Sequence, residues 1–353
     1  MGHIDDERRK AKIVTTARMT RVAAAAIASG FLLSYAFGAS AREGARRLMS
    51  ELKPQAVIHL GKTADWVAIA PDAVWVGSTE PNAVHRIDPR TNAVVATVML
   101  DGGPCAGLAI GLDSLWVPLC SASPTLAKID LASNRLVASF KVGGVSSEGG
   151  VTTSEDSVWL VVDKDGTLAS IDPGTGDVRQ KIRVPRGSYN PRFNEGMVWV
   201  TRADGAEITA VDAKTGKIRA SVRTGPGPRF LTAGAGAIWT LNQGDGTLTR
   251  IDASAAHATK SIPLETPGHG GDIAFGGGMI WTTMMKTPLS MIDAETETLR
   301  CQWTGAGGDS LGIGHRAIWL TDYHGGTISR FDLDDTKRAC ASVKAPSPTK
   351  PAR

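Results

Sequence analysis

The sequence predicts an all-β protein, a seven-bladed β-propeller of four-stranded antiparallel blades, from two repeated signatures. A tryptophan preceded by valine, leucine or isoleucine recurs seven times, at intervals of 38 to 43 residues. A hydrophobic residue followed by aspartate recurs in phase with it, 12 to 14 residues after each tryptophan. The seven tryptophans are Trp75, Trp116, Trp159, Trp199, Trp239, Trp281 and Trp319. A repeat of about forty residues with several short strands is typical of propeller blades, which close into a ring.

The composition agrees with one domain of many short strands. The 353 residues include 40 glycines and 18 prolines, which indicates many tight turns. The length alone would also fit two or three ordinary domains, but the repeats favour a single propeller over residues 55–343. The formal charge of +4 is small and the basic residues are scattered, so we expect no nucleic-acid partner. We expect a monomer, because a closed ring is self-contained.

Each repeat is expected to hold four strands joined by tight turns. In the fourth repeat, residues 192–193 lead an inner strand, and strands follow at 197–202, 208–212 and 217–223. The aspartate after each third strand precedes a hairpin turn, and we interpret it as a turn former and not as a carboxylate site. The repeated tryptophans are interpreted as core residues that pack blade against blade.

Two segments resemble the outermost strand of the seventh blade, residues 56–62 and residues 337–344. Either can complete that blade, and we expect the N-terminal segment to do so and close the ring. Residues 344–353, with three prolines and no apolar pattern, are expected to be a disordered tail.

Residues 1–41 have the pattern of a secretory signal peptide. Six basic residues precede an apolar run at 22–39, and Ala39-Ser40-Ala41 follows as a cleavage site. The alternative is an uncleaved membrane anchor, since about eighteen apolar residues can just span a bilayer. Either way, we expect a periplasmic or secreted protein.

The four cysteines fit an oxidising compartment. Cys105 and Cys120 flank two expected strands that turn near Leu112-Asp113, so we predict a disulfide across this hairpin. Cys301 and Cys340 lie one repeat apart on expected outer strands, and the sequence leaves their pairing open.

One face of the ring is expected to carry the site. The loops between second and third strands, and the connections into each next blade, differ from blade to blade, and variable loops on a rigid repeat commonly bind ligands. We call this side the variable face. Its candidate catalytic residues are His269, Asp309 and His324, and its candidate ligand-binding residues are Glu148, Arg192, Arg229, Asp272 and Tyr323. A histidine–carboxylate cluster can titrate near neutral pH or hold a divalent ion, although polar loop residues are more often simply solvated.

The blade motifs resemble a known family. Val74-Trp75-Val76 and Ile171-Asp172-Pro173-Gly174-Thr175-Gly176 are similar to the pattern of streptogramin lyases (virginiamycin B lyases), and shade into YVTN and gluconolactonase-like propellers. The resemblance covers about residues 55–343. It implies a magnesium ion and a histidine base that open a lactone ester by elimination. His269 and His324 fall at two of the family's site positions, but Gly308-Asp309-Ser310 stands where Glu-x-His is expected.

Two functions therefore remain open from the sequence. The first is an exported propeller that binds a small molecule in the funnel of the variable face, with a metal-assisted lyase or ester-cleaving activity implied by the resemblance. The alternative is a non-catalytic propeller that presents this face to a protein or cell-envelope partner. Fold alone does not choose between them.

Overall fold

The computed structural model describes residues 45–120, 125–144 and 147–341. The predicted signal segment and the predicted C-terminal tail lie outside these residues. In the described part of the chain, no helix has the length and hydropathy that a membrane span needs.

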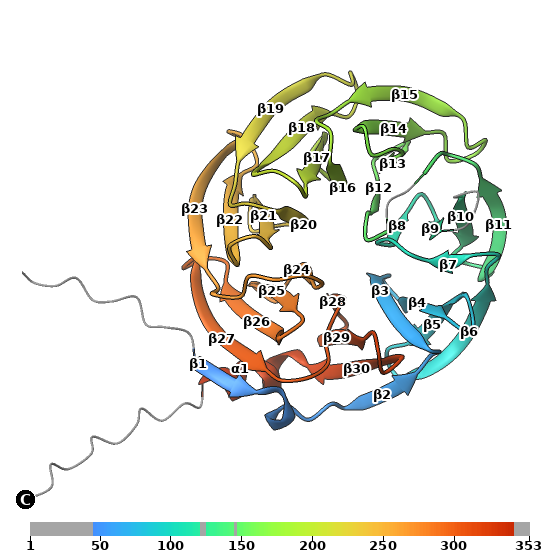
Figure 1. Cartoon of the computed structure of the whole chain (residues 1–353). Helices are drawn as coiled ribbons and strands as arrows, with labels where there is room; N and C mark the ends of the chain where they lie inside the picture. The colour runs from blue at the N-terminus through green and yellow to red at the C-terminus, as the bar shows by residue number, and fades with distance from the viewer. Residues whose placement is uncertain (1–44, 121–124, 145–146, 342–353) are drawn as a thin grey trace, which may run out of the picture. The chain divides into compact units, whose positions relative to one another are not determined.

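Seven β-sheets surround a central axis, which confirms the predicted seven-bladed propeller (Figure 1). Blade 1 holds β3 (Thr63–Ile69), β4 (Val74–Thr79), β5 (Ala83–Asp88) and β6 (Ala93–Met99). Blade 2 holds β7 (Gly103–Pro104), β8 (Ala109–Gly111), β9 (Ser114–Cys120), β10 (Thr125–Asp130) and β11 (Arg135–Phe140). Blade 3 holds β12 (Val151–Thr153), β13 (Val158–Val161), β14 (Thr167–Ile171) and β15 (Val178–Arg183). Blade 4 holds β16 (Ser188–Asn194), β17 (Met197–Arg202), β18 (Glu207–Asp212) and β19 (Ile218–Arg223), close to the strands predicted there.

The remaining blades follow the same order from the axis outward. Blade 5 holds β20 (Pro228–Gly234), β21 (Ala237–Asn242), β22 (Thr247–Asp252) and β23 (His257–Pro263). Blade 6 holds β24 (Asp272–Gly276), β25 (Met279–Met284), β26 (Thr287–Asp293) and β27 (Thr298–Thr304). Blade 7 holds β28 (Leu311–Gly314), β29 (Ala317–Asp322) and β30 (Thr327–Asp332). Neighbouring strands within these three blades are antiparallel, and the first strand of each lies nearest the axis, as β8 does in blade 2 (Figure 1).

The N-terminal segment completes the seventh blade. Strand β2 (Ala56–His59) pairs antiparallel with β30, with Ala56 opposite Arg330, so the predicted N-terminal closure is confirmed. The alternative, an outer strand at 337–344, does not form: residues 337–341 belong to helix α1 (Leu333–Ala341), and residues 342–344 lie outside the described residues. The Asp332 carboxylate accepts hydrogen bonds from the backbone N–H groups of Asp334 and Asp335, which satisfies the first turn of that helix.

Blade 6 gains a fifth strand that the sequence did not predict. Strand β1 (Ala45–Leu48) pairs in parallel with β27, with Ala45 opposite Cys301. A short 3-10 turn, η1 (Met49–Glu51), and β2 follow it, so the first described residues run along the outer edges of blades 6 and 7 (Figure 1).

The repeated tryptophans are core residues, as predicted. All seven are at most 1% exposed, in clusters shared by adjacent blades. The indole N–H of Trp239, for example, donates to the Gly234 carbonyl (3.0 Å) at the turn that precedes its strand. The tryptophans therefore do not form an exposed cage for a ligand.

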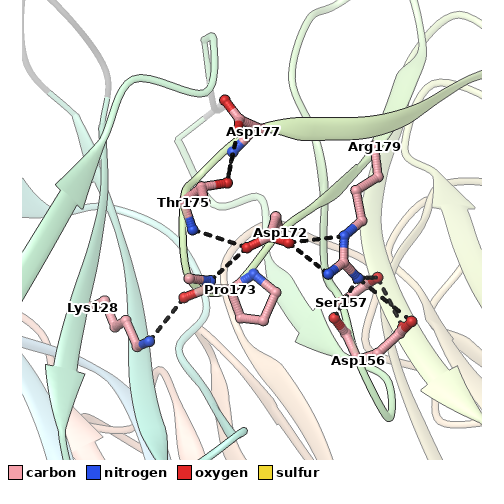
Figure 2. Close-up of polar contacts among 9 residues, drawn as sticks. Lys128, Asp156, Ser157, Asp172, Pro173, Thr175, Asp177 and Arg179 are labelled. Carbon is pink, nitrogen blue, oxygen red and sulfur yellow. Dashed lines mark hydrogen bonds and ion pairs between the residues drawn. The ribbon is translucent and has the colours of Figure 1, made fainter.

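The repeated aspartates shape the turns, also as predicted (Figure 2). Asp172 accepts hydrogen bonds from the N–H groups of Gly174 (2.7 Å) and Thr175 (2.9 Å), and its other oxygen accepts two from Arg179. The backbone N–H donors, followed by Arg179, lower the pKa of Asp172 to about 2. Asp212 repeats the arrangement with Thr215 and Arg219.

The structure also contains the predicted disulfide. Cys105 and Cys120 are bonded, with their Cα atoms 5.6 Å apart, across a hairpin whose turn residues Leu112 and Asp113 both have positive φ. Cys301 and Cys340 are free thiols that are buried in the same core cluster between β27 and α1.

Candidate functional site

A cavity of about 460 Å³ lies on the propeller axis, walled by the inner strands of all seven blades. We call it the axial channel. Each inner strand places one residue opposite the repeated tryptophan of its blade, and all seven of these residues line the channel. They are Ala68, Ala109, Thr152, Arg192, Thr232, Ala274 and Gly312. Six are small, so Arg192 is the single large and charged side chain at this level of the channel.

Arg192 lies free in the channel. Within the described residues its guanidinium has no hydrogen-bond or ion-pair partner. The side chain is accessible to water because the channel is open, yet protein surrounds it. Burial accordingly lowers the pKa of Arg192, while the negative charge of Asp272 opposes that shift.

Asp272 is the other charged residue that lines the channel. Its carboxylate accepts hydrogen bonds from the backbone N–H groups of Ile273 (2.7 Å) and Leu311 (3.3 Å), so both oxygens are held by the channel wall. Burial nevertheless raises the pKa of Asp272 to about 7. The predicted ligand-binding residues Arg192 and Asp272 therefore share one cavity, although they do not form an ion pair with each other.

A second cavity, of about 270 Å³, opens on the variable face beside the disulfide. We call it the mouth pocket. Glu148 and Tyr323, both predicted ligand-binding residues, line it together with Asp65 and Trp66. Glu148 also faces Arg229, whose Nη1 lies 3.6 Å from the Glu148 carboxylate and whose guanidinium stacks 4.7 Å above the Tyr189 ring.

Asp65 is a site residue that the sequence reasoning left out of its candidate set. It is 8% exposed and accepts hydrogen bonds from Ser310 Oγ (2.6 Å) and from the Trp66 backbone N–H (2.8 Å). Burial, and then the charge of Asp309, raise its pKa well above the usual value. Its only sequence signal is its place near the start of the inner strand β3, where the strand bulges and Trp66 takes a positive φ.

The predicted catalytic trio is only partly brought together. Asp309 accepts a hydrogen bond from the Gly271 N–H (3.0 Å), and the charge of His324 acts on it, but burial dominates and raises the pKa of Asp309. The His324 ring stands edge-on to Tyr323, with centroids 5.2 Å apart. His269 is exposed and, among the described residues, has no hydrogen-bond or ion-pair partner.

The magnesium ion that the lyase resemblance implies does not fit these residues. Across residues 45–120, 125–144 and 147–341, no three His, Cys, Asp or Glu side chains are grouped so that they can hold a metal ion. The predicted funnel set is divided instead: Arg192 and Asp272 line the axial channel, Glu148 and Tyr323 line the mouth pocket, and the remaining candidates line neither cavity.

Comparisons with known proteins point to a different family from the one that the motifs suggest. A family model described as outer membrane protein assembly factor BamB matches residues 83–338. The solved structure of BamB from Moraxella catarrhalis is similar in fold, with a TM-score of 0.56 and 11% sequence identity over 80% of this chain and 99% of that chain. No curated protein matches the sequence.

Proposed function

Because the chain belongs to the outer membrane protein assembly factor BamB family, we propose that it is a non-catalytic scaffold that binds a protein partner involved in outer-membrane assembly. The proposed location is the periplasmic side of the cell envelope. The Cys105–Cys120 disulfide supports this location, because disulfides persist in oxidising compartments.

The observation that carries this proposal is an exposed patch on the variable face. Met285 is 59% exposed in the loop between β25 and β26, and Tyr323 is 40% exposed in the corresponding loop of the next blade. Asp309 and Met285 both lie against Gly270, and Asp309 interacts with His324 beside Tyr323. These contacts connect the two exposed side chains. Methionine and tyrosine are enriched in protein interfaces.

The mouth pocket indicates the charge of the partner. Tyr323 lines it together with the acidic residues Asp65 and Glu148, and Trp66 adjoins Asp65. A carboxylate pocket with aromatic walls suits a lysine or arginine side chain, which gains both ionic and cation–π contacts. We therefore propose that the partner inserts a basic side chain into the mouth pocket while its apolar surface covers Met285 and Tyr323.

A lyase or ester-cleaving activity has weaker support. The resemblance to streptogramin lyases requires a histidine base next to a metal. In the part of the chain that the structure describes, His269 is an exposed side chain with no hydrogen-bond or ion-pair partner, and no three potential metal ligands are grouped. Turnover of a lactone or cyclic ester by the purified protein with added magnesium, lost in His324→Ala, would restore this reading.

The scaffold proposal is tested by affinity purification from envelope extracts. We expect the wild-type chain to retain a stoichiometric envelope protein and the Met285→Ser/Tyr323→Ala variant to lose it. The matched control is Val137→Ser/Ile218→Ser, which removes two exposed apolar side chains from the outer strands β11 and β19. Equal loss of the envelope protein in both variants, or its retention in both, would contradict docking at the exposed patch on the variable face.

A further inference from the structure

We propose that the axial channel binds a small organic oxyanion, such as a carboxylate, with Arg192 as its charged anchor. The axial channel is separate from the exposed patch of Met285 and Tyr323, and the proposed binding does not depend on the scaffold function. The argument begins with the repeat. Seven blades place seven equivalent side chains in the channel, and only blade 4 supplies an arginine where the others supply alanine, glycine or threonine.

The small side chains leave space around the guanidinium. The equivalent position in blade 7 is Gly312, which has no side chain to fill the channel. Alanine occupies this position in blades 1, 2 and 6. The channel is therefore wide at the level of Arg192, and its volume of about 460 Å³ is in the range of small-molecule sites.

The charge of Arg192 is not neutralised by the protein. Asp272, the sole carboxylate among the lining residues, directs its two oxygens to the backbone N–H groups of Ile273 and Leu311. A guanidinium has five N–H donors in a planar fork that matches an oxyanion. The Arg192 donors meet water in the open channel, and an anionic ligand would replace that water with charge-assisted hydrogen bonds.

The size of the channel and its mixed lining favour an organic ligand over a bare inorganic anion. Three of the seven phenylalanines in the sequence, Phe193, Phe230 and Phe275, line the channel, and isoleucines from blades 1, 2 and 7 line it too. The surface that the walls expose to the channel is mainly polar, and these apolar residues contribute the smaller part of it. A ligand with a carboxylate at one end and an aromatic or aliphatic body satisfies both the arginine and the walls.

Isothermal titration calorimetry with benzoate tests the site, with inorganic phosphate as a second arm. We expect benzoate to bind the wild-type protein and phosphate to bind much more weakly. Arg192→Gln should weaken benzoate binding at least about tenfold, which corresponds to about 1.4 kcal/mol, whereas Arg192→Lys should retain part of it because the charge remains. The control is Arg223→Gln, which removes an exposed arginine from the outer strand β19.

Each other outcome overturns the proposal in a defined way. Failure of the wild-type protein to bind either probe would remove the site. Phosphate binding equal to or tighter than benzoate binding would show an inorganic-anion site and reject the organic ligand. Benzoate binding that survives Arg192→Gln would place the ligand elsewhere. Thermal unfolding of each variant verifies that the loss of binding is not a loss of fold.

Discussion

Two sets of carboxylates in this propeller have opposite electrostatics. At the hairpin turns between third and fourth strands, Asp172 receives two backbone N–H groups and an arginine, and its pKa falls to about 2. At the channel and the mouth, burial dominates and raises the pKa of Asp65, Asp272 and Asp309. The turn set is repeated around the ring and supports the fold. The channel and mouth carboxylates do not follow the repeat, and their burial destabilises the folded state. Groups whose pKa values are perturbed in this way are enriched at functional sites.

The contrast between positions that follow the repeat and positions that depart from it also holds for one pair of residues. Trp199 and Arg192 face each other across β16 and β17. Trp199 is a repeat position and is 1% exposed, so Trp199→Ala should reduce the free energy of unfolding by about 3–5 kcal/mol. Arg192→Ala should change it by less than about 0.5 kcal/mol, because its guanidinium has no partner among the described residues. Chemical denaturation of both variants measures the difference. Comparable losses in the free energy of unfolding would show that the channel position supports the fold as much as the repeated core position does.

The disulfide lies where the repeat is interrupted. Blade 2 has its inner strand divided into β7 and β8, and the Cys105–Cys120 bond joins the intervening segment to β9. For a sequence separation of 15 residues, removal of the bond should cost about 3 kcal/mol through the entropy of the unfolded chain. Thermal unfolding of Cys105→Ser/Cys120→Ser gives the value. If the variant were as stable as the wild type, the bond would serve only to shape the mouth pocket that it lines.

Asp272 should make the fold less stable as the pH rises. Its pKa of about 7 in the folded protein exceeds the value of about 3.9 in an unfolded chain. Between about pH 4 and 7 the folded state keeps a proton that the unfolded state has released, so the free energy of unfolding falls with rising pH. Asp272→Asn removes this contribution, and we expect it to stabilise the protein at pH 8 by on the order of 1 kcal/mol.

The expected change for Asp272→Asn is a flatter plot of melting temperature against pH, and not a flat one, because burial also raises the pKa values of Asp65, Glu148 and Asp309. A variant with the same slope as the wild type would show that Asp272 is ionised in the folded protein at neutral pH.

Asp172 should show the opposite and smallest effect. Its lowered pKa means that its stabilising contribution is complete above about pH 4 and is lost as the pH falls toward 2. Asp172→Asn should therefore be slightly less stable than the wild type at pH 7 and indistinguishable from it near pH 2. Melting curves at both pH values test this, and Asp212→Asn is a matched second case in the next blade. A constant difference at both values would assign the effect to turn geometry and not to charge.

The sequence predicted the fold because it repeats the motifs of one blade seven times. Trp75 and its six counterparts mark the buried second strands, and turn aspartates such as Asp172 mark the outer hairpins, so blade number and strand order followed from spacing. The closing strand was left with two candidates because residues 337–344 also fit an outer strand, and only the pairing between β2 and β30 decides for the expected N-terminal segment.

The candidate site was harder to predict because a repeat reveals which residues depart from it but not where they point. Arg192 and Arg229 were assigned to one funnel, yet Arg192 lies in the axial channel whereas Arg229 pairs with Glu148 at the mouth. Asp65 was omitted because its burial depends on a strand bulge and on Ser310, a residue 245 positions away. His269 was included because of its predicted position on the variable face. Its exposed side chain shows that a position on this face does not by itself bring a residue into contact with the other candidates.

The pairing of β2 with β30 has a consequence for synthesis of the chain. The edge strand of blade 7 is made before any of the other blades, and its partner is made last, with Ala56 opposite Arg330. The ring therefore cannot be sealed until nearly the entire propeller has emerged, and a chain truncated before Thr327 would present an unpaired sheet edge at each end of an open arc. Such edges invite aggregation, so this single strand pair makes completion of the chain a condition for a soluble product.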